Sequence, residues 1–200
     1  MSTTHLTSTA PLRLRRWPVL FLPFCLLFGG PIGCGPGGDA VAPKRPLPTY
    51  IGHEAELFDD GIEPRAVGLE LETPDHPLHN PKFKERVDTA DAVVRARVTT
   101  VTAREEDTGT AYQVSLKTLE KLTGSHPPSQ TFTLDIDRRS GAVGVLRNFN
   151  GRLVGMSFIV FLRAYVRADG DQELHFHITQ DAEDIKKAVT ESAAVMGFAK

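Results

Sequence analysis

Alternating hydrophobic and polar positions organise the second half of the chain. Residues 92–102 alternate small or branched apolar side chains with Arg and Thr, and the same period of two recurs in residues 112–117, 131–137 and 174–178. This period is typical of β-strands with one buried and one solvated face. Residues 157–166 are apolar at almost every position, which indicates a central strand covered on both faces. The pattern predicts a mainly β fold of about five antiparallel strands that form a small β-barrel.

Two segments follow a helical period instead. After Asp181, acidic residues precede a stripe of small and apolar side chains at helical spacing, which predicts a C-terminal α-helix. The stripe consists of Ile185, Ala188, Val189, Ser192 and Met196. Asn80 is a favourable N-cap for a short helix through Thr89, in which Phe83 and Val87 would face the core.

The remaining segments are less regular. Residues 66–71 are apolar enough to predict a further short strand. Residues 138–150 are polar and contain two glycines, so they predict a long loop with a short strand at residues 143–146.

The first 34 residues have the organisation of an export signal. Arginines at positions 13, 15 and 16 precede the apolar run 17–28, which contains two prolines and is too short to cross roughly 30 Å of hydrocarbon. Small residues then lead to Cys34. This arrangement resembles the bacterial lipobox, in which a small residue precedes a lipid-modified cysteine, although Pro31 stands where that pattern usually has leucine.

The lipobox resemblance implies that Cys34 becomes the acylated N-terminus of a lipoprotein, and several acyl chains anchor a protein stably. Gly35, rather than aspartate, follows Cys34, which by resemblance to enterobacterial sorting implies the outer membrane of a Gram-negative source. The alternative is an ordinary secretory signal peptide with an incidental cysteine. Since Cys25 and Cys34 are the only cysteines, we expect no disulfide in the folded part.

These features divide the chain into four expected parts. They are a signal peptide at residues 1–33, the lipidated cysteine with a Gly/Pro-rich tether at 34–49, an ordered extension with a short helix at 50–89, and the β-barrel with its C-terminal helix at 90–200.

The charge distribution gives an expectation about partners. The formal net charge is −2, but all three charged residues of the first 34 positions are arginines, so the rest of the chain carries −5. Non-specific nucleic-acid binding needs clustered Lys and Arg. The mildly acidic body therefore predicts no nucleic-acid partner, and leaves the membrane, through the lipid anchor, and an envelope protein as expected partners.

Three stretches of the barrel segment carry a family resemblance. Residues 90–101 begin with ADAVV, residues 112–124 end in a leucine–lysine–glycine-like step, and residues 151–162 read GRLVGMSFIVFL. This pattern, which covers roughly residues 90–178, resembles the netrin-like OB-fold domains that include the tissue inhibitors of metalloproteases. The resemblance implies an OB-like barrel and, as one alternative function, protease inhibition. Inhibitory members use a free N-terminal cysteine and several disulfides, which this chain lacks.

Two groups of residues are candidates for a site. His175 and His177 would lie on the outward, solvated face of a strand, with Leu174, Phe176 and Ile178 on the inward face. Roughly 6–7 Å would separate the two histidines, a spacing that a metal ion can bridge. A metal-dependent hydrolase that uses these two histidines is therefore one alternative. The same alternation arises on any strand with one solvated face, so the sequence assigns no metal to them.

The second candidate is the predicted loop at residues 138–149. It offers a mixture of cationic and exposed apolar groups suited to binding a partner, namely Arg138, Arg139, Arg147 and Phe149. Neither a nucleophile elbow, nor a phosphate loop, nor a dinucleotide fingerprint occurs in the sequence. We therefore assign no catalytic residue and no cofactor, and interpret the chain as a non-catalytic, lipid-anchored protein of the outer membrane or cell surface.

Overall fold

The computed structural model describes residues 46–69, 76–107, 109–126, 128–167 and 169–198. The expected signal peptide, Cys34 and most of the tether lie outside these residues. The helices and 3₁₀ turns are α1 (His53–Leu57), η1 (Pro64–Val67), η2 (Pro77–His79), α2 (Pro81–Thr89), α3 (Ala142–Leu153) and α4 (Glu183–Phe198). The strands are β1 (Gly61–Ile62), β2 (Ala92–Glu106), β3 (Gly109–Gly124), β4 (Thr131–Ile136), β5 (Ser157–Val166) and β6 (Gln172–Gln180).

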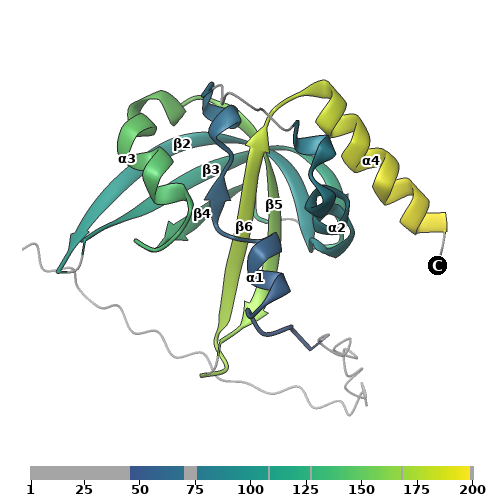
Figure 1. Cartoon of the computed structure of the whole chain (residues 1–200), viewed down its shortest axis with the longest axis horizontal. Coiled ribbons are helices and arrows are strands. Elements are labelled where there is room, and N and C mark those ends of the chain that lie inside the picture. The colour runs from purple at the N-terminus through teal and green to yellow at the C-terminus, as the bar shows by residue number, and fades with distance from the viewer. Residues whose placement is uncertain (1–45, 70–75, 108, 127, 168, 199–200) are drawn as a thin grey trace, which may run out of the picture. The chain divides into compact units, whose positions relative to one another are not determined.

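The strands form one curled sheet in the order β1-β6-β5-β2-β3-β4, which gives a half-barrel (Figure 1). The predicted mainly β class with a C-terminal helix is confirmed. All neighbouring strands pair antiparallel except β1 and β6, which pair parallel. The parallel pair makes the sheet mixed, and its edge strand β1 belongs to the extension that precedes the predicted barrel segment.

The long β2–β3 hairpin supplies much of the curvature. Its register shifts at three places, between Val93 and Val94, between Arg95 and Ala96, and between Val98 and Thr100. Bulges of this kind increase the local twist and bend the strand. They also explain why the period of two in β3 breaks after residue 117 while the strand continues to Gly124.

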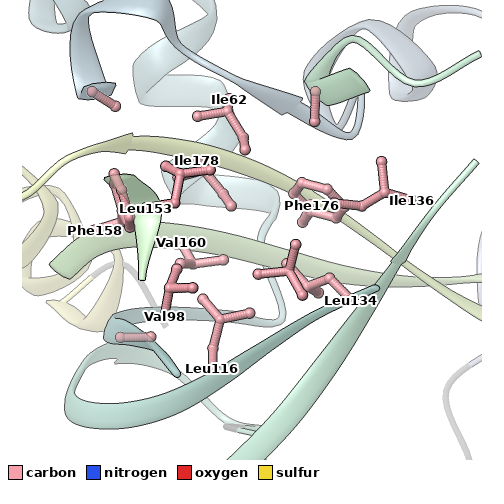
Figure 2. Close-up of a cluster of buried hydrophobic side chains, with 14 of the residues drawn as sticks. Ile62, Val98, Leu116, Leu134, Ile136, Leu153, Phe158, Val160, Phe176 and Ile178 are labelled. Carbon is pink, nitrogen blue, oxygen red and sulfur yellow. The ribbon is translucent and has the colours of Figure 1, made fainter. Parts of the chain in front are cut away.

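One face of the sheet carries the larger core (Figure 2). All six strands contribute to it, and α3 and η1 cover it with buried side chains such as Val67, Leu146 and Leu153. In Figure 2, Ile62 of the edge strand lies above Ile178 of β6, and Leu134 and Leu116 approach from the opposite end of the sheet. Burial of this apolar surface is the main stabilising contribution to the fold.

The other face carries a second core, built with α1, α2 and α4. Ile185 and Val189 of α4 pack there with Phe83 and Val87 of α2. β5 contributes to both cores, since Phe158, Val160 and Leu162 join the first while Ile159, Phe161 and Tyr165 join the second. The prediction that residues 157–166 form a strand covered on both faces is thus confirmed, and α4 covers the sheet.

The predicted helix at residues 80–89 is confirmed as α2. The Asn80 side chain accepts a hydrogen bond from the backbone N–H of Lys82 at 2.9 Å, and Pro81 occupies the first turn. Both features favour a helix start. Within the described residues, no helix combines the length and the apolar character needed to cross a membrane.

Two sequence predictions about the irregular segments are wrong. Residues 142–153, expected to be a loop with a short strand at 143–146, form helix α3. Val143, Leu146 and Leu153 share one buried face at helical spacing, and the first core supplies the packing that outweighs the two helical glycines. Residues 66–67, expected to begin a strand, belong to the turn η1 (Pro64–Val67), which is followed by its C-cap Gly68 with φ of 78°.

Candidate functional site

The histidine face of β6 is covered by chain from the extension. His175 and His177 are only 5% and 6% exposed, so the prediction that they face solvent is wrong. Residues 49–63, which we call the strap, run along this edge of the sheet. The backbone N–H groups of Asp60 and Glu63 donate to the carbonyls of Phe176 and Ile178, both at 2.9 Å. A strap held in this way removes the outer face of β6 from water.

His177 lies between two carboxylates of the strap. Its Nδ1 is 2.8 Å from an Asp59 oxygen, and its Nε2 is 3.1 Å from a Glu63 oxygen. Since ionised carboxylates only accept hydrogen bonds, both contacts are made when both ring nitrogens carry a proton. The Thr179 hydroxyl donates to the second oxygen of Glu63. The imidazole therefore joins β6 to the strap at two points.

His175 forms a second junction with the strap. Its Nδ1 is 2.7 Å from one oxygen of Asp60, whose other oxygen accepts the backbone N–H of Phe176 at 3.0 Å. These bonds hold Asp60 at a positive φ of 49°, which is uncommon for a residue other than glycine. Tyr50 stacks on the His175 ring with a centroid distance of 3.4 Å, and Tyr165 meets its edge at 5.4 Å.

Further polar contacts hold the first half of the strap. The Tyr50 hydroxyl donates to the carbonyl of Phe58 at 2.6 Å, and the Tyr165 hydroxyl donates to Glu54 at 2.8 Å. Buried Arg86 of α2 donates through Nε to the carbonyl of Leu57 at 2.6 Å. The strap is thereby joined to the sheet and to α2.

Burial and hydrogen bonding shift the pKa values of the strap carboxylates in opposite directions. Burial raises the pKa of Asp59 and Glu63, but the hydrogen bonds from His177 and the positive charge of Arg86 outweigh it, so both pKa values lie below the ordinary value. Burial dominates at Asp60, whose pKa is raised despite its bond to His175. Burial and the nearby carboxylates also raise the pKa of the Tyr50 hydroxyl.

This geometry leaves little room for chemistry. Each imidazole Nδ1 and the His177 Nε2 already face carboxylate oxygens, and the His175 Nε2 is buried without a hydrogen-bond partner in the described part of the chain. Across residues 46–69, 76–107, 109–126, 128–167 and 169–198, no three His, Cys, Asp or Glu side chains are placed to hold a metal ion. The cluster is arranged as a structural junction.

Sequence reasoning missed the acidic half of this cluster. Asp59, Asp60 and Glu63 lie more than 110 residues before the histidines, and a period of two along β6 contains no information about what covers its outer face. The only local signal is the Asp59-Asp60-Gly61 sequence, which is typical of a turn.

The second candidate group gathers at a different place. Arg138, Arg139 and Arg147 line an open hollow of about 460 Å³ together with Val143 and the first two residues of β3, Gly109 and Thr110. We call this the arginine hollow. Phe149, the fourth predicted binding residue, does not line it. Its ring packs against the first core, with the guanidinium of Arg152 at 5.6 Å.

Comparisons with known proteins are sparse. No family model and no curated protein matches the chain. One similar solved structure is the small single-stranded DNA-binding protein from Streptomyces coelicolor, at 20% identity over 46% of this chain and 86% of that one, with a TM-score of 0.20. A likeness at this TM-score carries no argument about what this chain binds.

One expectation about partners needs correction. The prediction that the chain has no nucleic-acid partner is wrong as an exclusion: the similar structure is that of a single-stranded DNA-binding protein, and this likeness assigns no partner to this chain. The prediction was made from the net charge, which averages over the whole surface of a domain, whereas binding depends on local charge. The arginine hollow is locally cationic on a chain with net charge −2.

Proposed function

We propose that the chain is a lipid-anchored cell-envelope protein whose folded domain is a non-catalytic binding module. The lipobox-like segment that ends at Cys34 supports the anchor, and Gly35 supports a position at the outer membrane or cell surface. Eleven residues rich in Gly and Pro separate Cys34 from Pro46, where the described domain begins. A linker of this composition gives a domain freedom to reach a ligand beside its membrane.

The junction between β6 and the strap is the observation that supports a non-catalytic function. Catalytic acids, bases and metal ligands need access to a substrate. Among the described residues, histidines and carboxylates gather at a buried place around His175 and His177. There the imidazoles contact the carboxylates of the strap, and Tyr50 stacks on the His175 ring. What the surface offers instead is the arginine hollow, which suits recognition.

We expect that lipidation depends on Cys34 and not on Cys25. Wild-type chain and the Cys25→Ser control should partition into the detergent phase, because acyl chains supply about 0.8 kcal/mol for each buried CH₂. The Cys34→Ser chain should remain in the aqueous phase. Intact mass spectrometry of the membrane fraction should give a chain that begins at Cys34 and carries acyl groups. An unmodified Cys34, or equal partitioning of Cys34→Ser and wild type, would contradict the proposed anchor.

A further inference from the structure

Strand β4 forms one edge of the sheet (Figure 1). The Thr118 N–H donates to the carbonyl of Gln130 at 2.9 Å, which fixes the alternation of hydrogen bonds between β3 and β4. By this alternation, every second residue of β4 points its backbone N–H and C=O away from the sheet. These outward residues are Thr131, Thr133 and Asp135. Apart from the Thr131 carbonyl, which accepts the Ser129 hydroxyl, their backbone groups have no partner among the described residues.

This edge lacks the features that usually block a further strand. Exposed sheet edges are commonly protected by proline, lysine, a β-bulge or extreme shortness. β4 has six residues, none of them proline, lysine or glycine, and its register with β3 runs without a shift. The opposite edge differs, because β1 has only two residues and belongs to the strap. β4 can therefore pair with one more strand.

The exposed face beside this edge carries opposite charges at its two ends. At one end, Thr131 pairs with Lys117, and Lys117 pairs with Arg97 of β2. Both cations are exposed, and neither forms an ion pair in the part of the chain that the structure describes. At the other end lie the exposed acids Asp135 and Asp137. A strand that runs antiparallel to β4 with the same charge distribution would match these ends with opposite charges.

We propose that the chain forms a two-fold symmetric dimer in which β4 pairs antiparallel with β4 of a second copy, with the axis at Thr133. The two Thr133 residues then exchange both backbone hydrogen bonds, and Thr131 of each copy does the same with Asp135 of the other. An axis at Asp135 would instead place two carboxylates directly opposite each other, which is unfavourable. This inference goes beyond the proposed function and does not depend on the anchor.

The pairing also supplies Asp135 with a new partner. Opposite it stands Thr131 of the second copy, and Lys117 of that copy lies one strand further, about 5 Å away. The lysine side chain is long enough to pass the short threonine. Both bonds that Asp135 accepts within its own chain, from Arg104 and Gln113, use Oδ1, so Oδ2 is left for the lysine.

Cysteine cross-linking of the full-length chain, in a Cys25→Ser/Cys34→Ser background, tests this register. Thr133→Cys should form a disulfide-linked dimer under mild oxidation, because opposite residues of a hydrogen-bonded pair have Cα atoms about 5.5 Å apart. Thr131→Cys, exposed on the same face of β4, is the matched control. The two copies of residue 131 would be offset by about 13 Å and should stay unlinked. Equal cross-linking of the two variants, or none in Thr133→Cys, would overturn the proposal.

Association itself is measured by sedimentation of the full-length chain in detergent, with micelles in excess over protein. The wild type should dimerise as its concentration rises. Thr133→Lys should raise the dissociation constant about fivefold or more, because two ammonium groups then meet at the axis. Thr100→Lys is the control: Thr100 is exposed and pairs with Ser115, which pairs with Thr133, so the same charge is added two strands from the edge.

Thr100→Lys should dimerise as the wild type does, and circular dichroism should show that both lysine variants are folded. Equal dissociation constants for Thr133→Lys and the wild type would place any dimer contact elsewhere on the molecule and contradict the proposal. A wild type that stays monomeric at every concentration would also contradict it, and would leave the β4 edge to an extended segment of another protein.

Discussion

Replacing His177 with glutamine is expected to lower the free energy of unfolding by about 3 kcal/mol. The substitution removes the imidazole that contacts both Asp59 and Glu63, so two carboxylates of the strap lose a hydrogen-bond donor. A buried acceptor left without its donor costs about 1–3 kcal/mol, and of the two acceptors here the Asp59 side chain is 48% exposed. Urea unfolding of the full-length chain, followed by circular dichroism, measures the change.

His53→Gln is the matched control for this prediction. His53 also pairs with a carboxylate at 2.8 Å, that of Glu85, but both side chains are about half exposed, at 57% and 45%. An exposed pair of this kind contributes roughly 0–1 kcal/mol. If both histidine variants lost the same small free energy, the junction between the strap and β6 would not be the stabilising feature described here.

Gly124→Ala is expected to destabilise the fold by about 3 kcal/mol or more, through strain. Gly124 ends β3 with φ of 97°, and a Cβ at this position would lie 2.2 Å from the carbonyl oxygen of Asp91 and 2.5 Å from the Cα of Ala92. Both obstacles are backbone atoms at the start of β2, where Ala92 is fully buried and paired on both sides, so they cannot move aside cheaply.

Gly144→Ala serves as the control for the glycine prediction. Gly144 is exposed in α3, and nothing lies within 4 Å of its added Cβ. Alanine favours helix over glycine by about 1 kcal/mol, so this variant should be as stable as wild type or more so. The same unfolding experiment compares the two. A Gly124→Ala chain as stable as Gly144→Ala would show that the hairpin end is not constrained as described.

The strands could be predicted from the sequence because their signal is local. In β4, Phe132, Leu134 and Ile136 are buried while the residues between them are exposed, as the period of two requires. β5 was recognisable as a doubly covered strand for the same reason. A local pattern records which faces are buried, and for these strands the tertiary structure agrees with it.

Other features depend on contacts that no local window contains. α3 was mistaken for a loop because Gly144, Asn148 and Gly151 obscure its helical period, and only packing on the first core decides in favour of a helix. The outer face of β6 was interpreted as solvated because histidine alternates there with apolar residues. Its burial is caused by a strap whose acids lie at residues 59–63, beyond the reach of any periodicity argument.

The structure groups the three predicted binding arginines and places Phe149 apart from them. Arg138, Arg139 and Arg147 were nominated as a binding surface from residue type, and the structure brings all three to one hollow. Their gathering depends on the helix that the sequence failed to predict, because the first turns of α3 place Val143 and Arg147 on one side. Phe149 comes two positions after Arg147, about 200° further around the helix, and packs on the core instead.

The most direct test of the central claim is the metal content of the full-length chain, purified without a histidine tag. Elemental analysis measures it in the wild type and in the His177→Gln variant side by side. The claim is that the polar cluster joins the strap to β6 and that the domain is a non-catalytic binding module. It predicts metal far below one equivalent in both chains and a loss of stability in His177→Gln alone. One equivalent of a transition metal in the wild type, lost in His177→Gln, would contradict it and favour the metal-dependent hydrolase.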